Sequence, residues 1–499
     1  MNMIEERKQV KLKKITLFIM GVLGIVFYFG LGEWISMESD TPAYLYEQGR
    51  EGVLPGYPTF IAFFRFLMGA DYYLHGVVVA QSILAIVCTM IFVVVLQKQF
   101  QITNVESIFL YIVTMLPFSI YLPEVGITHQ ILTEGITYSL FYLYFIMVLK
   151  AMWEKKYRWY LACLLGAIIM GLIRSQMLFL QVICFCVLLW ITWHRANKRV
   201  LGCFVVLILG AVLAFGSYKA IYGVIAFDRQ VWKEKDDEKN KALKIAAAEE
   251  RGEEYVEIPI EEMPPEEQEW YRIHELDSQE TTSQITALIA SRGIFEADEE
   301  DYLLFEDEIV RDIFIKVYKI ADDKGQLHSH AKKGLYMWED LVHDEMMQNI
   351  NIAVEEYDKE NVGKRNISTA SLGRILGGTL LIHHFDRYVY HCIRLMIPSF
   401  IASVFFQIRP IYLLCHFIAL FIYLFAIGGI VWLRKNGGNI QLIEYITGIV
   451  VTLIFMVIIV NLVFTGLQRY VVYGMGIFWC GMYLQIREMW LLLRKKNKI

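Results

Sequence analysis

Ten long apolar runs are the feature that most constrains how this 499-residue chain can fold. A helix needs about 20 mostly apolar residues to cross a bilayer, and only helices and closed barrels satisfy their own backbone hydrogen bonds in lipid. Apolar residues make up 56% of the chain, more than in ordinary soluble domains. The sequence therefore predicts an all-α integral membrane protein with about ten transmembrane helices. The expected spans are 15–34, 77–96, 107–122, 131–149, 159–173, 177–193, 200–218, 411–433, 443–464 and 471–486.

Basic residues at the ends of these runs set the expected orientation. If the N-terminus is cytoplasmic, the inner segments hold 20 Lys and Arg residues, whereas the short outer loops hold only four. Membrane proteins concentrate Lys and Arg in cytoplasmic loops. We therefore expect a multi-pass protein of the cell membrane with both termini in the cytoplasm. The first run is followed by no small-residue cleavage site, so it is expected to be a retained span and not a removed signal.

The segment 388–406 is apolar enough to be mistaken for another span. A crossing here would place Arg434, Lys435 and the basic C-terminus outside, against the bias of the other loops. Arg394 and Pro398 also interrupt the run. We expect instead an interfacial helix that lies against the outer leaflet.

The chain divides by composition into two membrane modules and an insertion. The expected N-terminal module covers residues 1–218, with a first outer loop at 35–76, and the C-terminal module covers residues 411–499. Between them, 219–410 is expected outside the membrane, and its portion 234–323 holds 28 of the 52 acidic residues. Apolar residues recur at helical spacing from 302 to 357, so the acidic insertion is expected to be mainly helical.

Several chemistries have no counterpart in the sequence. It has no GxGxxG dinucleotide turn, no P-loop, no HExxH zinc motif and no convincing Asp-x-Asp metal motif of soluble sugar-nucleotide transferases. The eight cysteines lie in apolar runs and are expected to be small apolar residues, not disulfide partners. His383, His384 and Asp386 could bind a metal, but their spacing is generic, and a polar junction beside the interfacial helix is the preferred interpretation.

The first outer loop carries charges directly after the first span. Glu38 and Asp40 stand where the chain leaves the hydrocarbon, and Asp40 with the Thr-Pro pair after it predicts a capped helix start. Tyr44 follows one helical turn later. The sequence Pro-Gly-Tyr-Pro at 55–58, which contains Tyr57, is expected to end that short helix and send the chain along the surface.

Other charges flank later spans, where charge is costly and often functional. Glu134 opens the fourth span with Thr133 before it, and His129 lies in the same short loop. Arg174, followed by Gln176, separates the fifth and sixth spans. The pair Arg469-Tyr470 precedes the last span. All these places fall on the outer face in the predicted topology, whereas ordinary helix caps would be spread over both faces.

This set of residues resembles the GT-C glycosyltransferases, multi-spanning enzymes that use polyprenyl-phosphate sugars and include protein O-mannosyltransferases and lipid A aminoarabinose transferases. Their first loop has an acid soon after the first span, then an aromatic residue and a Pro-Tyr-Pro-like turn. Thr133-Glu134, Arg174 and Arg469-Tyr470 also match family positions, although Tyr473-Gly474 stands where the family usually has a proline. The resemblance covers spans one to seven and the last span, while the acidic insertion matches nothing in the family.

The resemblance implies a role for each matched residue. Asp40 would accept the proton of the attacking hydroxyl, and Glu134 would orient the acceptor, share the base role or hold a divalent cation. Arg174 and Arg469, with Tyr470, would bind the donor phosphate. The expected substrate-positioning residues are Glu38, Tyr44, Tyr57, His129 and Gln176.

The expected function is inverting transfer of a sugar from a polyprenyl-phosphate donor to a glycan, lipid or protein acceptor of the cell envelope. The active site would lie on the outer face, with the bilayer as a partner and no nucleic acid. One alternative is a polysaccharide polymerase or ligase that acts on lipid-linked oligosaccharides and does not need Asp40. Another is a transporter or flippase of lipid-linked sugars, which predicts charges at mid-membrane, and a non-catalytic scaffold also stays open.

Overall fold

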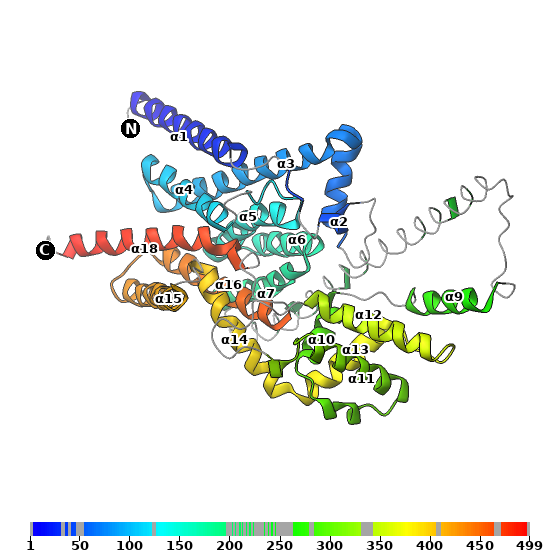
Figure 1. Ribbon diagram of the computed structural model, residues 1–499. Coiled ribbons are helices and arrows are strands. Elements are labelled where there is room, and N and C mark those ends of the chain that lie inside the picture. The colour runs from blue at the N-terminus through cyan, green and yellow to red at the C-terminus, as the bar shows by residue number, and fades with distance from the viewer. Residues whose placement is uncertain are drawn as a thin grey trace. The chain divides into compact units, whose positions relative to one another are not determined.

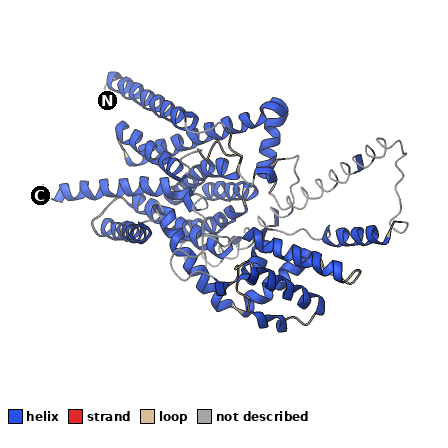
Figure 2. Ribbon diagram, viewed as in Figure 1, coloured by secondary structure: helices blue, strands red, loops and turns tan. Residues whose placement is uncertain are grey.

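The computed structural model describes ten stretches of the chain and single positions between residues 202 and 245. The stretches are 3–30, 35–37, 41–45, 54–121, 126–195, 263–278, 284–330, 343–405, 411–463 and 471–496. Within them the protein is all-helical (Figure 2), and the one β-type pairing is an isolated bridge between Ser36 and Gln130. The all-α prediction is confirmed. Glu38, Asp40, Arg469 and Tyr470 lie outside the described residues.

The chain forms two compact units. Unit 1 comprises Met1–Ala226, Ile397–Val460 and Gly466–Ile499, and unit 2 comprises Phe227–Met396 and Asn461–Thr465. The main helices of unit 1, labelled in Figure 1, are α1 (Met3–Gly30), α2 (Thr41–Tyr44), α3 (Gly56–Phe100), α4 (Asn104–Tyr121), α5 (Thr133–Glu154), α6 (Tyr157–Ile173), α7 (Leu180–Arg195), α15 (Tyr412–Lys435), most of α16 (Ile440–Val463) and α18 (Met475–Lys496). Two short 3-10 helices, η1 (Ser175–Phe179) and η6 (Val472–Gly474), precede α7 and α18.

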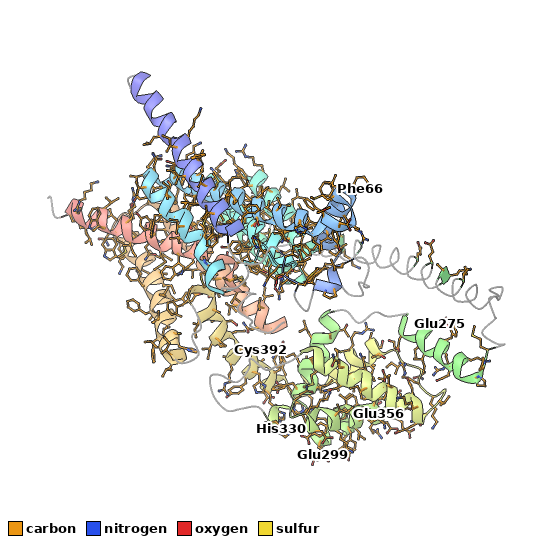
Figure 3. The ribbon with its side chains drawn as sticks, turned by 45° about the horizontal axis from the view of Figure 1, so that its top comes forward. Phe66, Glu275, Glu299, His330, Glu356 and Cys392 are labelled. Carbon is orange, nitrogen blue, oxygen red and sulfur yellow. The ribbon has the colours of Figure 1, made fainter. Side chains whose placement is uncertain are left out.

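Six described segments are long and apolar enough to cross a membrane. They are Leu12–Gly30, Gly56–Phe100, Thr133–Glu154, Gln176–Trp193, Leu413–Lys435 and Ile440–Leu462. Asn104–Met115 and Tyr157–Ile173 are shorter apolar helices. Large apolar side chains stay exposed on several of them, for example Phe421 on α15 at 68% and Phe66 on α3 at 87%. Phe66 is labelled in Figure 3. Such exposed apolar helices indicate a membrane protein, because water would disfavour these surfaces.

The Pro-Gly-Tyr-Pro sequence begins a helix, which differs from the expected surface turn. Helix α2 does start at Thr41, as predicted, but Pro55 then becomes the N-cap residue of α3, and Pro58 lies in the first turn of that helix. Proline is tolerated there because the first backbone N–H groups of a helix lack intrahelical partners. Helix α3 is interrupted at Gly69, whose φ of +76° is accessible to glycine. Much of the expected outer loop 35–76 is therefore helical.

Helix α5 packs at the centre of unit 1, with α3 and α6 among its neighbours. Tyr138 and Tyr142 are buried residues of α5. Their hydroxyls lie 2.6 Å apart, and both donate to the carbonyl of Thr114 on α4. These paired contacts satisfy polar groups that burial would otherwise leave without water. Helix α5 is thereby fixed in rotation, which sets the direction of the side chains in its first turn.

Unit 2 is a small helical domain with its own core. Its elements are α9 (Pro265–Ser278), α10 (Gln284–Phe295), η3 (Glu299–Leu304), α11 (Glu308–Asp323), η4 (His328–His330), α12 (His343–Glu360), α13 (Thr369–His383) and the first part of α14 (Phe385–Val404). Helices α10 and α13 touch backbone to backbone, because a Cβ on Gly293 would lie 2.5 Å from the Gly377 carbonyl. Ile313 and Val317 of α11 are buried in the core, as the helical spacing predicts.

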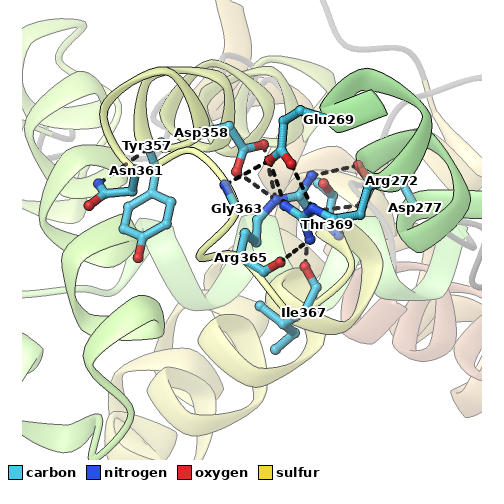
Figure 4. A network of polar contacts seen from close by, with 10 residues as sticks. All are labelled: Glu269, Arg272, Asp277, Tyr357, Asp358, Asn361, Gly363, Arg365, Ile367 and Thr369. Atoms are coloured by element: carbon cyan, nitrogen blue, oxygen red, sulfur yellow. Dashed lines mark hydrogen bonds and ion pairs between the residues drawn. The ribbon is translucent and has the colours of Figure 1, made fainter. Parts of the chain in front are cut away.

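A charged hub joins three segments of unit 2 (Figure 4). Arg365, only 1% exposed, donates through Nη1 and Nη2 to Asp277 at 3.0 Å and through Nε to Asp358 at 2.9 Å. The backbone N–H of Thr369 also donates to Asp277 at 2.7 Å. The hub ties the end of α9 to α12 and to the start of α13, so the described helices of unit 2 form a defined tertiary structure.

Candidate functional site

A buried polar cluster lies where α5 begins and α6 ends. We call it the Arg174 cluster, and it consists of Thr133, Glu134, Arg174 and Gln176. Arg174 Nη1 lies 2.5 Å from Glu134 Oε2, and the same nitrogen donates to the Thr133 hydroxyl at 2.6 Å. Arg174 Nε donates to the Gln176 amide oxygen at 2.6 Å. The structure therefore brings three of the predicted site residues together.

The backbone at the end of α6 directs Arg174 into this cluster. The helix stops at Ile173, and Arg174 adopts an extended conformation, with φ −148° and ψ 122°. Its carbonyl accepts from the N–H of Met177 as η1 begins. This single extended residue between two helices turns the guanidinium across the bundle toward the first turn of α5.

Glu134, the acidic partner of Arg174, lies at the start of α5. Leu132 is the N-cap residue of α5, has extended backbone and supplies no side-chain cap. Glu134 therefore lies in the first turn, where the positive end of the helix dipole favours an acidic side chain. The Thr133 hydroxyl donates to Glu134 Oε2 at 3.0 Å. The carboxylate is held from its own helix as well as by Arg174.

Burial makes the two charges of the cluster interdependent. The side chains of Glu134 and Arg174 are only 3% and 10% exposed. Removing one partner of such a buried pair leaves an uncompensated charge and is strongly unfavourable. A phosphate that binds Arg174 must therefore compete with Glu134, and the exchange would release the carboxylate for another contact.

A second polar chain supports the first turn of α5. Tyr57 is fully buried and donates its hydroxyl to Gln81 Oε1 at 2.8 Å. The Gln81 amide donates to the carbonyls of Thr128 and Gln130 at 2.8 and 3.1 Å. A Cβ on Gly135 would lie 2.7 Å from Gln81 Cδ, so this amide packs directly on the residue after Glu134.

The described parts of the first outer loop are tied to the segment before α5. The N–H of Ser36 donates to the His129 carbonyl at 3.0 Å, and the N–H of Ile131 donates to the Ser36 carbonyl at 3.1 Å. The Thr41 hydroxyl donates to the Ile131 carbonyl at 3.2 Å. Residues 36 and 41, on both sides of Asp40 in the sequence, therefore hold the same short segment.

Tyr44 and His129, two predicted substrate-positioning residues, make internal contacts. The rings of Tyr44 and Tyr57 meet edge to face with centroids 5.3 Å apart. His129 is buried, and its Nε2 lies 2.5 Å from the Tyr28 carbonyl on α1. The structure thus places His129 as a contact to α1. Tyr57 and Tyr44 pack in the apolar cluster that includes Ile131 and Ile136 at the start of α5, while Gln176 directly contacts Arg174.

Sequence reasoning did not single out Gln81. It is a lone amide in the apolar stretch from Val77 to Phe92, and such a group needs buried hydrogen-bond partners. That isolated polar position was the available signal. Thr41 was noted only for its place at a helix start, and its contact with Ile131 depends on tertiary structure.

Metal-binding geometry occurs elsewhere among the described residues. One group there, in unit 2, has three suitable ligand atoms close together, on Asp301, His383 and His384. It shares the two histidines with the sequence-based suggestion but has Asp301 in place of Asp386. Glu134 is not part of it.

No protein-family model matches the chain, and no curated protein matches its sequence.

Proposed function

We propose that this protein is a membrane glycosyltransferase that transfers a sugar from a polyprenyl-phosphate donor to a cell-envelope acceptor. The observation that carries the proposal is the buried ion pair of Glu134 and Arg174. A guanidinium presents a planar fork of donors that suits phosphate oxygens. A carboxylate beside it can accept or orient a hydroxyl proton. The pair thus supplies both kinds of group that the reaction needs.

The proposed topology has ten spans, cytoplasmic termini and residues 219–410 outside the membrane. Six helices long and apolar enough to span support it. The distribution of Lys and Arg supports the orientation, with 20 on the predicted inner side and four in the short outer loops. In this topology the Arg174 cluster faces the outer interface, where the donor's phosphate would lie while its tail stays in lipid.

The proposed reaction is an inverting displacement. The bond between sugar C1 and the phosphate oxygen breaks, and its electron pair leaves with the polyprenyl phosphate. The acceptor oxygen forms a bond to C1 from the opposite face, and its proton passes to Asp40. Arg174 and Arg469 stabilise the charge that builds on the departing phosphate. Asp40 directly precedes Thr41, which contacts Ile131 three residues before Glu134, and this supports a shared site.

The Arg174 cluster would change partners during this cycle. Donor phosphate binds the Arg174 guanidinium in exchange for Glu134, and the released carboxylate orients the acceptor hydroxyl. Gln176 keeps the guanidinium in place through its contact with Nε. After the product leaves, the internal ion pair re-forms. This exchange gives Glu134 a positioning role distinct from the base role of Asp40.

The deciding experiment measures sugar transfer by purified full-length protein from a radiolabelled polyprenyl-phosphate sugar to envelope acceptor fractions. Asp40→Asn should reduce turnover by a factor on the order of 10²–10⁴, the usual range for a lost general base. Asn caps a helix about as well as Asp, so folding should be retained. Arg174→Ala should weaken donor use, and Arg174→Lys should restore it only in part.

The matched control is Asp71→Asn, which neutralises an exposed carboxylate on α3 outside the Arg174 cluster. Its transfer rate should equal that of the parent. If Asp40→Asn also transfers sugar at the parent rate from a lipid-phosphate donor, the proposed mechanism is wrong. Activity restricted to lipid-linked oligosaccharides, with Asp40 dispensable, would instead assign the protein to the polymerases or ligases.

The topology has its own test, labelling of introduced cysteines with a membrane-impermeant reagent in intact cells. A cysteine at Glu267 should react from outside, and one at Lys435 should react only after permeabilisation. Six of the seven described cysteines are buried and Cys186 is half-buried, so the native background should be low. Labelling of position 435 from outside would overturn the proposed orientation of the C-terminal module.

A further inference from the structure

Unit 2 concentrates histidine–carboxylate contacts around the junction of α13 and α14. His384 Nε2 lies 2.7 Å from Asp301 Oδ2, and both side chains are buried. His391 Nδ1 contacts the buried Glu296, and His328 Nε2 lies 3.6 Å from Asp298 Oδ1. Among these contacts, the one of His384 and Asp301 is distinct because a second histidine stands beside it.

That second histidine is His383, the last residue of α13. Its ring and that of His384 have centroids 4.7 Å apart and cross at 81°. The nearest ligand atoms of Asp301, His383 and His384 all lie within 4.8 Å of one another. Two imidazoles and one carboxylate therefore converge from two different elements, α13 and η3.

Backbone contacts hold two of the three residues, His384 and Asp301. His384 ends α13 as its C-cap residue, and its N–H donates to the Leu380 carbonyl at 2.8 Å. Asp301 is the third residue of η3 and takes part in a capping box with Asp298, whose N–H donates to Asp301 Oδ2 at 2.7 Å. Outer contacts of this kind orient ligands in metal sites. Element η3, which contains Asp301, can be located in Figure 3 by the label of its first residue, Glu299.

We propose that Asp301, His383 and His384 bind a zinc ion. Zinc takes imidazole nitrogen and carboxylate oxygen at about 2.0–2.2 Å, and sites with three protein ligands keep a fourth position for water. Imidazole ligands disfavour calcium and magnesium, which prefer oxygen. The metal replaces the hydrogen bond between His384 Nε2 and Asp301 Oδ2, whose 2.7 Å separation widens to the roughly 3.3 Å that a tetrahedral zinc requires. The exposed His383 side chain rotates toward the ion, since the three ligand atoms lie within 4.8 Å of one another before binding.

The exposure of the three ligands suits such a site. Asp301 and His384 are buried, whereas His383 is exposed, so an ion can enter from the solvent side and complete its coordination there with water. The bound ion would clamp the α13–α14 junction to η3, two segments distant in sequence. Because zinc would bind the folded state and not the unfolded state, it should also protect this part of unit 2 against unfolding.

A simple ion pair of Asp301 and His384 is the competing explanation. Substitution of His383 distinguishes this ion pair from a zinc site. An ion pair needs no contribution from the exposed His383, whereas a zinc site loses one of its three protein ligands when His383 is changed. His383→Ala is also the variant least able to disturb the fold. Asp301→Asn and His384→Ala test the buried ligands.

The experiment uses detergent-solubilised full-length protein stripped with a chelator, exposed to zinc and passed through gel filtration. Metal content by mass spectrometry should be one zinc per chain, and competition with a chromophoric chelator should give its affinity. Cobalt(II) in the same site should show the visible absorption of a tetrahedral complex. His383→Ala should lower zinc affinity at least tenfold, and Asp301→Asn should abolish stoichiometric binding.

The matched control is His330→Gln. His330 Nε2 lies 2.7 Å from Asp322 Oδ1 in an exposed pair on the same unit, so it reproduces the distance without the second imidazole. This variant should bind one zinc as tightly as the parent. Parent protein that retains less than one zinc, or His383→Ala protein that binds zinc as tightly as the parent, would overturn the proposal. If the buried variants fail to fold, His383→Ala still decides between the explanations.

Discussion

Arg174 Nη1 lies 2.5 Å from Glu134 Oε2, although Glu134 belongs to the first turn of α5 and Arg174 is the extended residue that follows α6. Both side chains are almost fully buried, so each charge is compensated by the other and by Thr133 and Gln176. The pair is therefore a coupled unit, in which the removal of one charge changes the environment of the other. Any test of function must separate loss of this coupling from loss of catalysis.

Single neutralisation of either member of the pair should destabilise unit 1. Arg174→Gln leaves a buried carboxylate without its cation, and breaking a buried pair in this way costs about 3–5 kcal/mol. Glu134→Gln should cost a similar amount. The double variant should be far more stable than the sum of the two single effects predicts, because no charge remains buried alone. SDS-induced unfolding followed by circular dichroism would measure the three free energies of unfolding.

The control pair for this comparison of single and double variants is Arg158 with Glu154. Arg158 Nη2 lies 2.9 Å from Glu154 Oε2, and the two side chains are 65% and 25% exposed. Exposed pairs contribute about 0–1 kcal/mol, so Arg158→Ala should change stability little. Additive effects of the two single changes at Glu134 and Arg174 would show that the buried pair is not coupled as described.

Gly135→Ala should disturb the site through packing alone. The new Cβ would lie 2.7 Å from Gln81 Cδ. That amide cannot move freely, because it accepts from Tyr57 and donates to two carbonyls. Overpacking of this kind costs about 1–3 kcal/mol. We expect a lower free energy of unfolding in the same unfolding assay and, under the proposed function, weaker equilibrium binding of the polyprenyl-phosphate donor.

Gly21→Ala is the matched control, since no heavy atom lies within 4 Å of a Cβ at that position of α1. An alanine there should leave stability unchanged or raise it by up to about 1 kcal/mol through helix propensity. Adding Gln81→Ala to Gly135→Ala should relieve the clash. Equal stability of the two glycine variants would mean that the amide is not held as the hydrogen bonds indicate.

The helices of unit 1 and the Arg174 cluster were predictable to different degrees. Apolar runs predicted α5 and α6 because burial and lipid exposure both demand continuous apolar helices. Glu134 and Arg174 stood out because charge beside such runs is costly. Their direct pairing could not be predicted, since it depends on how α5 packs on its neighbours and on one extended residue after Ile173.

Local sequence patterns also point to the wrong structure at two places where tertiary contacts determine the conformation. Pro-Gly-Tyr-Pro is typical of a turn, yet Tyr57 is buried by its contact with Gln81, and the chain continues there as helix. At the proposed zinc site, Asp386 is close to the histidines in sequence, but the carboxylate near both imidazoles is that of Asp301. Contacts between residues distant in sequence leave no local pattern, so a single sequence does not reveal them.

Arg365 should be the most sensitive single position of unit 2. Its side chain is 1% exposed and serves two carboxylates, so Arg365→Met leaves Asp277 and Asp358 without the cation that both of them contact. Loss of such a buried partner costs about 3–5 kcal/mol. Backbone hydrogen exchange of α9 and α13 should become faster by the corresponding factor, and Arg365→Lys should rescue only part of it, because an ammonium lacks the guanidinium fork.

The control for this hub is Lys316→Met. Lys316 pairs with Glu360 at 2.8 Å, but the Glu360 side chain is 62% exposed, so screening by water limits the interaction. Hydrogen exchange of α11 and α12 should stay close to that of the parent. Equal effects of Arg365→Met and Lys316→Met would contradict a central role for the hub.

Asp277 and Asp358 should respond to acid in opposite directions although they share one guanidinium. Burial disfavours the charged form of both. For Asp277, hydrogen bonds from Arg365 and Thr369 outweigh burial, so its pKa is lowered, whereas burial prevails at Asp358 and raises its pKa. A carboxylate with a lowered folded pKa stabilises the fold above its unfolded pKa, about 3.9, and loses that contribution as pH falls through the folded value. The raised pKa of Asp358 acts the other way, since its folded form gains stability as pH falls.

Asp277→Asn should therefore flatten the loss of α9 protection between about pH 5 and pH 2, and Asp358→Asn should steepen it. Hydrogen exchange, corrected for intrinsic rates at each pH, measures both profiles, and identical profiles for the two variants would refute the division of roles.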